Sequence, residues 1–230
     1  MNIINLDSKK PNLDRLNHQG SESTIYICGN RLYKIFNDDV NLQLKEQSID
    51  FLDENRDSLR GVIMPIEKIK VNGSFVGHSM NRYDCSPIDS YFSSNVSFAD
   101  RYMCSIDLMS TFNRINHLGL EHDDFHADNV LIDQKGIPLI GDCTSFKPGD
   151  LSLRYKQEQL VMLLSLLSGY NLMNEVNNSV CISEIIDNLG NSSMLDYYYK
   201  PDGILSHKML YNFKPDTAKV NSLVKQYGGM

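Results

Sequence analysis

The sequence has few cysteines, and they are poorly placed for pairing. Five occur among 230 residues, so their number is odd, and no two form a C-x-x-C motif. A small disulfide-held secreted protein or a zinc ribbon would show more cysteines at closer spacing. We therefore expect reduced thiols that mostly pack as small apolar groups in a cytoplasmic protein.

Long apolar runs are also missing. The longest, residues 160–170 (LVMLLSLLSGY), is too short to cross a bilayer and predicts a buried helix. Residues 1–17 hold neither a long apolar run nor a cleavage-site pattern, so we expect no membrane span and no ordinary secretory signal. Delivery into a host cell by a specialised secretion system needs no such signal and stays open.

Positive charge is in short supply. The chain carries 22 Lys and Arg against 29 Asp and Glu, a net charge of −7. This balance argues against general binding to nucleic acid or to anionic membranes, which attract basic surfaces. It leaves room for a nucleotide, because local cations, backbone N–H groups and metal can hold one. The length of 230 residues suits one domain or two small lobes.

The first third of the chain has the pattern of strands with one helix. Residues 23–36 predict a hairpin around Gly29-Asn30, and residues 61–83 predict a second around Asn72-Gly73. Residues 39–52, between them, have the apolar spacing of a helix.

The rest of the chain is predicted to be mainly helical. Ser97 and Asp100 predict the start of a helix that runs to about His117 and ends at Gly119. Residues 129–142 predict a tight hairpin, and residues 155–169 a further helix, while the last 60 residues suggest short helices and loops. We expect an α+β protein with a strand-rich lobe over 1–83, a linker near 83–96, and a helical lobe within 84–230.

Negative charge crowds into residues 121–142 (EHDDFHADNVLIDQKGIPLIGD), which hold six acidic groups and two histidines beside apolar runs. Like charges this close repel one another unless a cation lies among them. Asp124 and Asn129 are five residues apart in one loop, and Asp142 follows the return strand of the predicted hairpin. Carboxylate and amide oxygens of this kind can hold Mg²⁺ together with phosphates.

The segment HDDFHADN, residues 122–129, resembles the catalytic loop H-x-D-x-x-x-x-N of the protein-kinase-like superfamily. The resemblance implies a bilobal fold with a small β-rich N-lobe and a reduced, mainly helical C-lobe. It implies ATP as cofactor, Asp124 as the catalytic base, and Asn129 and Asp142 as ligands of Mg²⁺ or Mn²⁺.

The same resemblance extends upstream. Residues 19–36 look like the first three strands of the family, which makes Lys34 the lysine that contacts the phosphates and Glu46 its partner. Residues 78–83 would be the linker whose backbone meets adenine, with Met80 and Arg82 as binding residues. The loop that covers the phosphates would be formed by Gly20, Ser21 and Ser23.

The sequence departs from the family pattern at several positions. The phosphate loop keeps one glycine of three, Asp142-Cys143-Thr144 stands in place of D-F-G, and no A-P-E follows. The segment after Asp142 is short and the helical lobe is reduced, and in both features the chain resembles minimal bacterial effector kinases. This likeness implies transfer of the γ-phosphate of ATP to a serine or threonine of another protein, with a host protein as one possibility.

Three alternatives remain at this stage. His126 lies two residues after Asp124, where serine/threonine kinases usually have lysine, and is more like the aminoglycoside and choline phosphotransferases, which are small-molecule kinases. The altered loops favour a pseudokinase that binds partners without catalysis. A zinc site formed by His122, Asp124 and His126 is the third. We expect His122 to be structural, and His126 either to steady the phosphate or to face solvent.

Overall fold

The computed structural model describes residues 1–6, 14–19, 22–92 and 95–169. Gly20, Ser21 and residues 170–230, with the short helices predicted near the C-terminus, lie outside this described part. The chain forms two compact units. The first contains Met1–Asp84 and Ile140–Lys147, and the second contains Cys85–Leu139 and the chain from Pro148 on. The segment 140–147 therefore joins the first unit, although the sequence analysis had assigned it to the second lobe.

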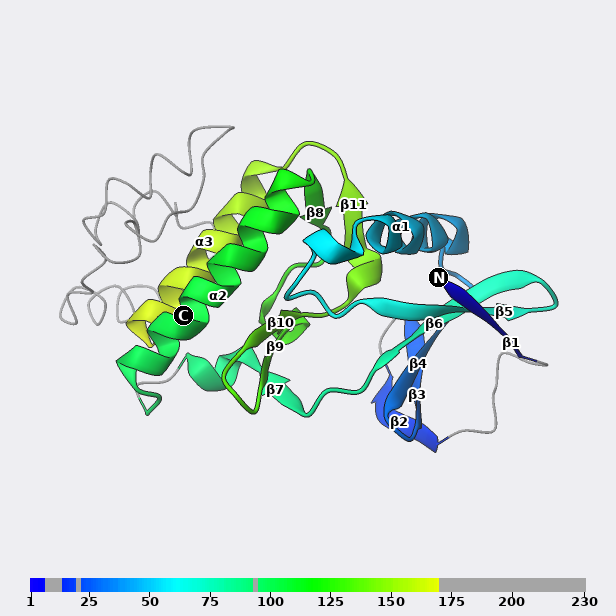
Figure 1. Ribbon diagram of the computed structural model, residues 1–230, viewed down its shortest axis with the longest axis horizontal. Helices are drawn as coiled ribbons and strands as arrows, with labels where there is room; N and C mark the ends of the chain where they lie inside the picture. Colours follow the sequence, from blue (N-terminus) through cyan, green and yellow to red (C-terminus); the bar gives the residue numbers. More distant parts are fainter. Residues whose placement is uncertain (7–13, 20–21, 93–94, 170–230) are drawn as a thin grey trace. The chain divides into compact units, whose positions relative to one another are not determined.

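The first unit is built on a six-stranded sheet with the order β1-β5-β6-β4-β3-β2 (Figure 1). The edge strand β1 runs parallel to β5, and the pairings of β2 with β3, β3 with β4, β4 with β6 and β5 with β6 are antiparallel. Its strands are β1 (Asn2–Leu6), β2 (Asp14–Gln19), β3 (Ser23–Cys28), β4 (Arg31–Phe36), β5 (Pro65–Val71) and β6 (Ser74–Asn81).

Both predicted hairpins of this sheet are confirmed. Asn72 and Gly73 have φ angles of 50° and 80°, which is the left-handed pair that a two-residue turn between twisted strands needs. Gly29, with φ of 55°, begins the turn between β3 and β4. The strands at 2–6 and 14–19 were not predicted.

Helix α1 (Leu42–Glu54) packs on one face of the sheet. It begins three residues later than predicted because the Asn41 side chain accepts a hydrogen bond from the Leu44 N–H and caps it. Ile49 of α1 is buried against Phe36 and Phe75 of the sheet. The opposite face has its own apolar cluster, formed by Ile35, Ile69 and Val76 with four partly buried neighbours. A short 3-10 turn, η1 (Arg56–Ser58), follows α1.

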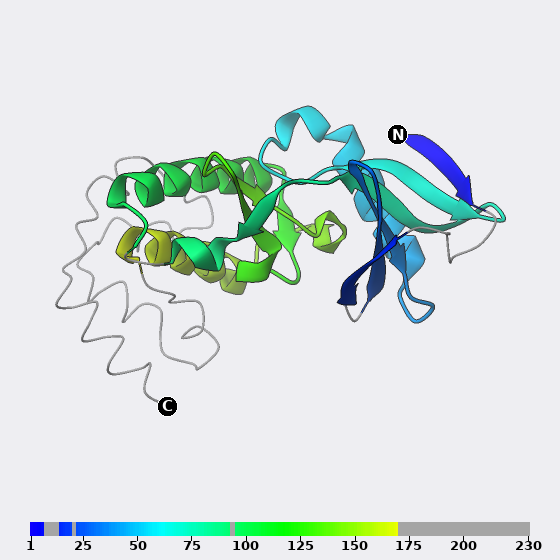
Figure 2. The ribbon, with the colours of Figure 1, turned by 90° about the horizontal axis from the view of Figure 1, so that it is seen from below.

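The second unit contains the helices α2 (Phe98–His117) and α3 (Leu153–Ser168), which lie side by side (Figures 1 and 2). Ser97 caps α2 by accepting from the Asp100 N–H, as predicted. Gly119 and Gly169 end the two helices with φ angles of 62° and 76°. Asn116 and Gln159 join the helices through two reciprocal amide hydrogen bonds of 3.0 Å each.

Short strands complete the fold. The predicted hairpin is confirmed as β9 (Val130–Asp133) and β10 (Pro138–Ile140), and Asp133 fixes its turn by accepting from the Lys135 and Ile137 N–H groups at 2.8 Å. The other short elements are β7 (Cys85–Pro87), η2 (Ile88–Tyr91), β8 (Leu120–His122), η3 (Ala127–Asn129), η4 (Cys143–Ser145) and β11 (Phe146–Pro148). Within the predicted linker near 83–96, β7 pairs antiparallel with β9.

The predicted α+β class is confirmed by this mixture of a large sheet and separate helices. Among the residues that the structure describes, no helix is both long enough and apolar enough to cross a membrane, as expected.

Candidate functional site

Lys34 is a buried cation in the middle of the first unit. Its exposed fraction is 8%, and it lies on β4 two residues before Phe36, so both side chains point to the sheet face that carries α1. The Nζ atom lies 5.7 Å from the centroid of the Phe36 ring. A buried ammonium group is stable only with a partner of opposite charge.

Asp142 is that partner, since its Oδ1 accepts a hydrogen bond from Lys34 Nζ. The backbone of Ile140 brings Asp142 to this place. Ile140 donates to the Gly61 carbonyl and accepts from the Ile63 N–H, both at 2.8 Å. The sequence prediction named Lys34 and Asp142 as two functional residues, and the structure brings them together within one unit.

Asp142 heads a tight turn that orients its own carboxylate. Its φ and ψ of 43° and 53° lie in the left-handed region, which is uncommon for a residue other than glycine and is often found at functional sites. Thr144 Oγ1 donates to Oδ1 at 3.0 Å, and Ser145 Oγ donates to Oδ2 at 2.9 Å. Both hydroxyl groups belong to buried residues. These hydroxyls, which the sequence analysis did not assign a role, hold the carboxylate in a segment that lacks the Phe and Gly of D-F-G.

His78 is a third residue to which the sequence analysis gave no role. It stands opposite Lys34 in the pairing of β4 with β6, is fully buried, and places Nε2 3.8 Å from Cys143 Sγ. Burial, and then the nearby Lys34 charge, lower the pKa of His78 to about 3, so the ring is neutral at physiological pH. Its Nδ1 atom has no hydrogen-bond partner among the described residues.

Cys143 is not a nucleophile in this setting. Burial, and then the neighbouring Asp142 charge, raise the pKa of its thiol to about 12. This agrees with the expectation that the cysteines pack as apolar groups.

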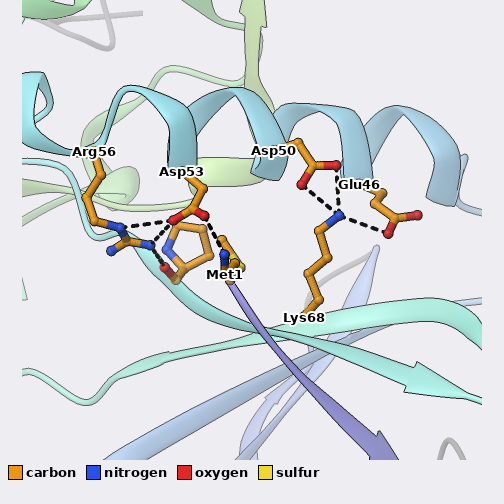
Figure 3. A network of polar contacts seen from close by, with 7 residues as sticks. Met1, Glu46, Asp50, Asp53, Arg56 and Lys68 are labelled. Carbon is orange, nitrogen blue, oxygen red and sulfur yellow. Dashed lines mark hydrogen bonds and ion pairs between the residues drawn. The ribbon is translucent and has the colours of Figure 1, made fainter.

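Glu46 is not the partner of Lys34 in this structure, and that prediction is wrong here. Lys68 Nζ, on β5, lies 3.0 Å from Glu46 Oε1 and 2.7 Å from Asp50 (Figure 3). Lys70 Nζ, also on β5, lies 3.7 Å from Glu46 Oε1. Burial lowers the pKa of Lys68, but the hydrogen bonds with Asp50 and Glu46 outweigh it and raise the pKa. Lysines on β5 therefore compete for the carboxylate expected to serve Lys34.

The other end of α1 is fixed in a similar way. Asp53 accepts from the amino group of Met1 at 2.8 Å and from Arg56, whose guanidinium also donates to the Pro65 carbonyl (Figure 3). The hydrogen bond from the amino group is the main cause that lowers the pKa of Asp53. Ion pairs thus tie α1 to the sheet along its length.

The residues predicted to cover the nucleotide are less well placed. Ser23 begins β3 opposite Phe36 and is buried, so its side chain is not part of an open loop. Met80 lies within β6, paired with β4 on one side and β5 on the other, and the Arg82 N–H donates to the Asn30 carbonyl at 2.9 Å. The predicted linker at 78–83 is therefore wrong in its bounds, because β6 continues to Asn81.

In the second unit, Phe125 anchors the loop that carries the kinase-like motif. Its ring packs edge to face against those of Phe112, His122 and Tyr155, with centroids 5.5, 5.9 and 5.4 Å away. His122 is buried, as expected for a structural residue. Since Phe125 points inward, the residues on each side of it point outward.

Asp124 and His126 are these outward residues, with side chains 70% and 43% exposed. Asn129 closes the loop, because its Nδ2 donates to the Asp124 carbonyl at 2.7 Å and lies 3.0 Å from His126 Nε2. The loop therefore holds an exposed carboxylate and an amide group in fixed positions. Asp124 can accept a proton, and the Asn129 amide oxygen is available to a cation.

The zinc site proposed from His122, Asp124 and His126 is wrong. His122 packs inward against Phe125 while the other two point outward, and no group of three or more His, Cys, Asp or Glu in the described part of the chain could hold a metal. The oxygen donors fit Mg²⁺ better, because this ion binds few protein groups and takes its other ligands from water and phosphate.

Comparison with protein-family models and with curated proteins finds no match to this chain.

Proposed function

We propose that the protein is an ATP-dependent phosphotransferase of the protein-kinase-like type, with a bilobal fold, that transfers the γ-phosphate of ATP to a hydroxyl group. The observation that carries this proposal is the loop at 122–129. It combines the H-x-D-x-x-x-x-N pattern with an exposed Asp124 carboxylate and an Asn129 amide whose nitrogen is bonded inward. A base for the attacking hydroxyl and an oxygen ligand for the metal are the two parts that phosphoryl transfer needs from such a loop.

Lys34 and Asp142, the buried ion pair of the first unit, would bind the phosphates and the metal. Lys34 would bind phosphate oxygens of ATP, and Asp142 would be a ligand of Mg²⁺ or Mn²⁺. The bound metal supplies neutralisation of the phosphate charge. Without nucleotide, Lys34 and Asp142 neutralise each other. Binding of the metal and ATP would give each of them a new partner of opposite charge.

Three of the predicted residues, Glu46, Met80 and Arg82, are engaged elsewhere in this structure. Glu46 would have to leave Lys68 and Lys70 before it could assist Lys34. Met80 would act from within β6, and Arg82 through its side chain, because its N–H is bonded to Asn30.

The acceptor we propose is a serine or threonine of another protein, with a host protein as the candidate class if the chain is secreted. A small-molecule acceptor is the second candidate, and the specific observation that favours it is His126 beside Asp124, with Nε2 3.5 Å from Oδ2. The first proposal follows from the likeness to minimal bacterial kinases, and the second from the likeness to aminoglycoside and choline phosphotransferases.

Transfer of labelled phosphate tests the proposal. Radiolabelled ATP with Mg²⁺ or Mn²⁺ would be supplied to the wild type and to the Asp124→Asn and Asp142→Asn variants, with a eukaryotic lysate or with aminoglycosides and choline. The Asp123→Asn variant is the matched control, because it removes a carboxylate from the adjacent exposed position.

We expect labelled proteins with the wild type and the control, and a loss of at least about 100-fold with the other two variants. Label on a small molecule alone would move the acceptor to the second candidate. If ATP neither reacts nor raises the melting temperature of the wild type, the proposed function is wrong. Binding without any transfer would indicate a pseudokinase.

A further inference from the structure

The hydrogen bonds around Asn129 determine where the proton lies on His126. The backbone carbonyl of Asp124 can only accept, so the Asn129 amide atom 2.7 Å from it must be Nδ2. This fixes the orientation of the amide, which atom positions alone often leave ambiguous. Amide nitrogen can only donate, so His126 Nε2, at 3.0 Å from Nδ2, must accept and carries no proton.

The same assignment describes the contacts of His126 with the two nearby carboxylates. Asp124 Oδ2 lies 3.5 Å from Nε2, but neither atom has a hydrogen to share, so this approach is not a hydrogen bond. The ring proton is on Nδ1, which faces Asp128 Oδ2 at 3.6 Å, beyond direct hydrogen-bond distance. The closest polar contact of the His126 ring is therefore with Asn129.

We infer that His126 is a positioning residue, which holds the Asn129 amide with its nitrogen inward and its oxygen Oδ1 outward toward a metal ion. The inference rests on the proposed function for the role of Oδ1, but not for the position of the ring proton. Within the described residues, both Asn129 side-chain contacts use Nδ2, and none uses Oδ1. The two donor positions of the amide are filled, which prevents rotation that would turn Oδ1 away.

Backbone geometry supports this role. The Asn129 N–H donates to the His126 carbonyl at 3.1 Å, so the two residues are joined through both main chain and side chain. The buried Phe125 fixes the adjacent residue of the loop. A lysine at position 126 could not accept from the Asn129 amide, because an ammonium group has only donors. This role differs from the two expected for His126 from sequence, which were to steady the phosphate or to face solvent.

Nuclear magnetic resonance of the full chain labelled with ¹⁵N-histidine tests the proton position directly. We expect His126 in the Nδ1–H tautomer at neutral pH. The Asn129→Ala variant, which lacks the donor, should populate the Nε2–H tautomer. A wild-type ring in the Nε2–H form would overturn the inference, whatever the activity of the protein. The Asn129→Asp variant, which also lacks the donor, should behave like Asn129→Ala.

The affinity of the protein for a metal ion tests whether His126 orients Asn129 Oδ1. Titration of Mn²⁺ into the protein with ATP would compare the wild type with His126→Gln, which keeps an acceptor, and with His126→Leu and His126→Lys, which lack one. Loss of a group that orients a metal ligand weakens binding about 10–100-fold. We expect this loss in the Leu and Lys variants, and a change of less than about threefold in the Gln variant.

These outcomes distinguish failure of the positioning role from failure of the proposed function. Wild-type affinity in the Leu variant, whose melting curve shows that it is folded, would overturn the positioning role. Absence of Mn²⁺–ATP binding in the wild type would instead contradict the proposed function, and the tautomer experiment would still decide the hydrogen bond.

Discussion

Single residues in the first unit form a row of charged and neutral groups on one sheet face. Lys34, His78 and Lys68 stand opposite one another on β4, β6 and β5. Each lysine has carboxylate partners, whereas His78 lies between them and contacts the Cys143 thiol. A neutral imidazole is the form that this position tolerates, because a third cation would have no partner.

His78 should make the stability of the protein dependent on pH. Its pKa is about 3 in the folded protein and 6.5 in an unfolded chain, so below pH 6.5 the unfolded chain binds a proton that the folded chain does not. Stability from this group is therefore present above pH 6.5 and is lost as the pH falls toward 3. Between pH 6.5 and 5 the loss should be about 2 kcal/mol.

Urea unfolding of the wild type and the His78→Gln variant at pH 7 and pH 5 measures this effect. The variant should lose less stability over this interval, by about 2 kcal/mol. An equal loss in both proteins, or a His78 resonance that titrates between pH 5 and 8, would contradict the burial of this ring.

At the scale of elements, the β5–β6 hairpin shows what sequence could and could not predict. Asn72-Gly73 identified the turn, and an unbroken two-residue hairpin would place Lys68 opposite Gly77. The register shifts by one residue between Ile69 and Lys70, so Lys68 stands opposite His78 instead. No residue type in this hairpin predicts the bulge. Lys68 pairs with Glu46 of α1, whereas the resemblance had assigned Glu46 to Lys34.

The ends of the helices were more predictable because their signals are local. Ser97, Gly119 and Gly169 mark helix ends by their own hydrogen bonding and backbone angles. The roles of Thr144 and Ser145 depend on the left-handed turn at Asp142, which the sequence does not reveal. Long-range contacts such as that of His78 with Cys143 join residues 65 positions apart and leave no pattern in either segment.

At Gly77 the backbone of β6 lies close to that of β4. A Cβ atom there would lie 2.1 Å from the Lys34 carbonyl oxygen, and the backbone on both sides is fixed by sheet pairing. The Gly77→Ala variant should lower the free energy of unfolding by about 1–3 kcal/mol, measured by urea denaturation. Gly149→Ala is the matched control, since nothing lies within 4 Å of its Cβ position. Equal stability of the two variants would show that this part of the sheet can move apart.

At the scale of the whole molecule, the proposed chemistry divides between the units. Lys34 and Asp142 belong to the first, and Asp124 and Asn129 belong to the second. If all four serve one reaction, substitutions in the two units should affect the same product in different ways. Residues that bind phosphate should alter nucleotide affinity, and the base should alter turnover alone.

Lys34→Met and Asp124→Asn provide this comparison. Lys34→Met should weaken ATP binding and also reduce turnover. Asp124→Asn should bind ATP within about threefold of the wild type while turnover falls about 10²–10⁴-fold, as expected for loss of a general base. Calorimetry of ATP binding and initial rates of transfer measure the two effects. Lys135→Met, at an exposed hairpin turn, is the control for loss of a lysine. Unchanged turnover in Lys34→Met would show that Lys34 of the first unit takes no part in the reaction. Unchanged turnover in Asp124→Asn would show the same for Asp124 of the second unit.

The return of residues 140–147 to the first unit has a consequence for biosynthesis. A ribosome completes residues 1–84 long before it adds Asp142, so the nascent first unit has its sheet sequence but lacks the carboxylate that neutralises buried Lys34. The isolated β-bridge between Val62 and Ile140 is also absent until then. Folding of the first unit during translation therefore cannot finish before helix α2 and the loop at 122–129, both in the second unit, have been synthesised.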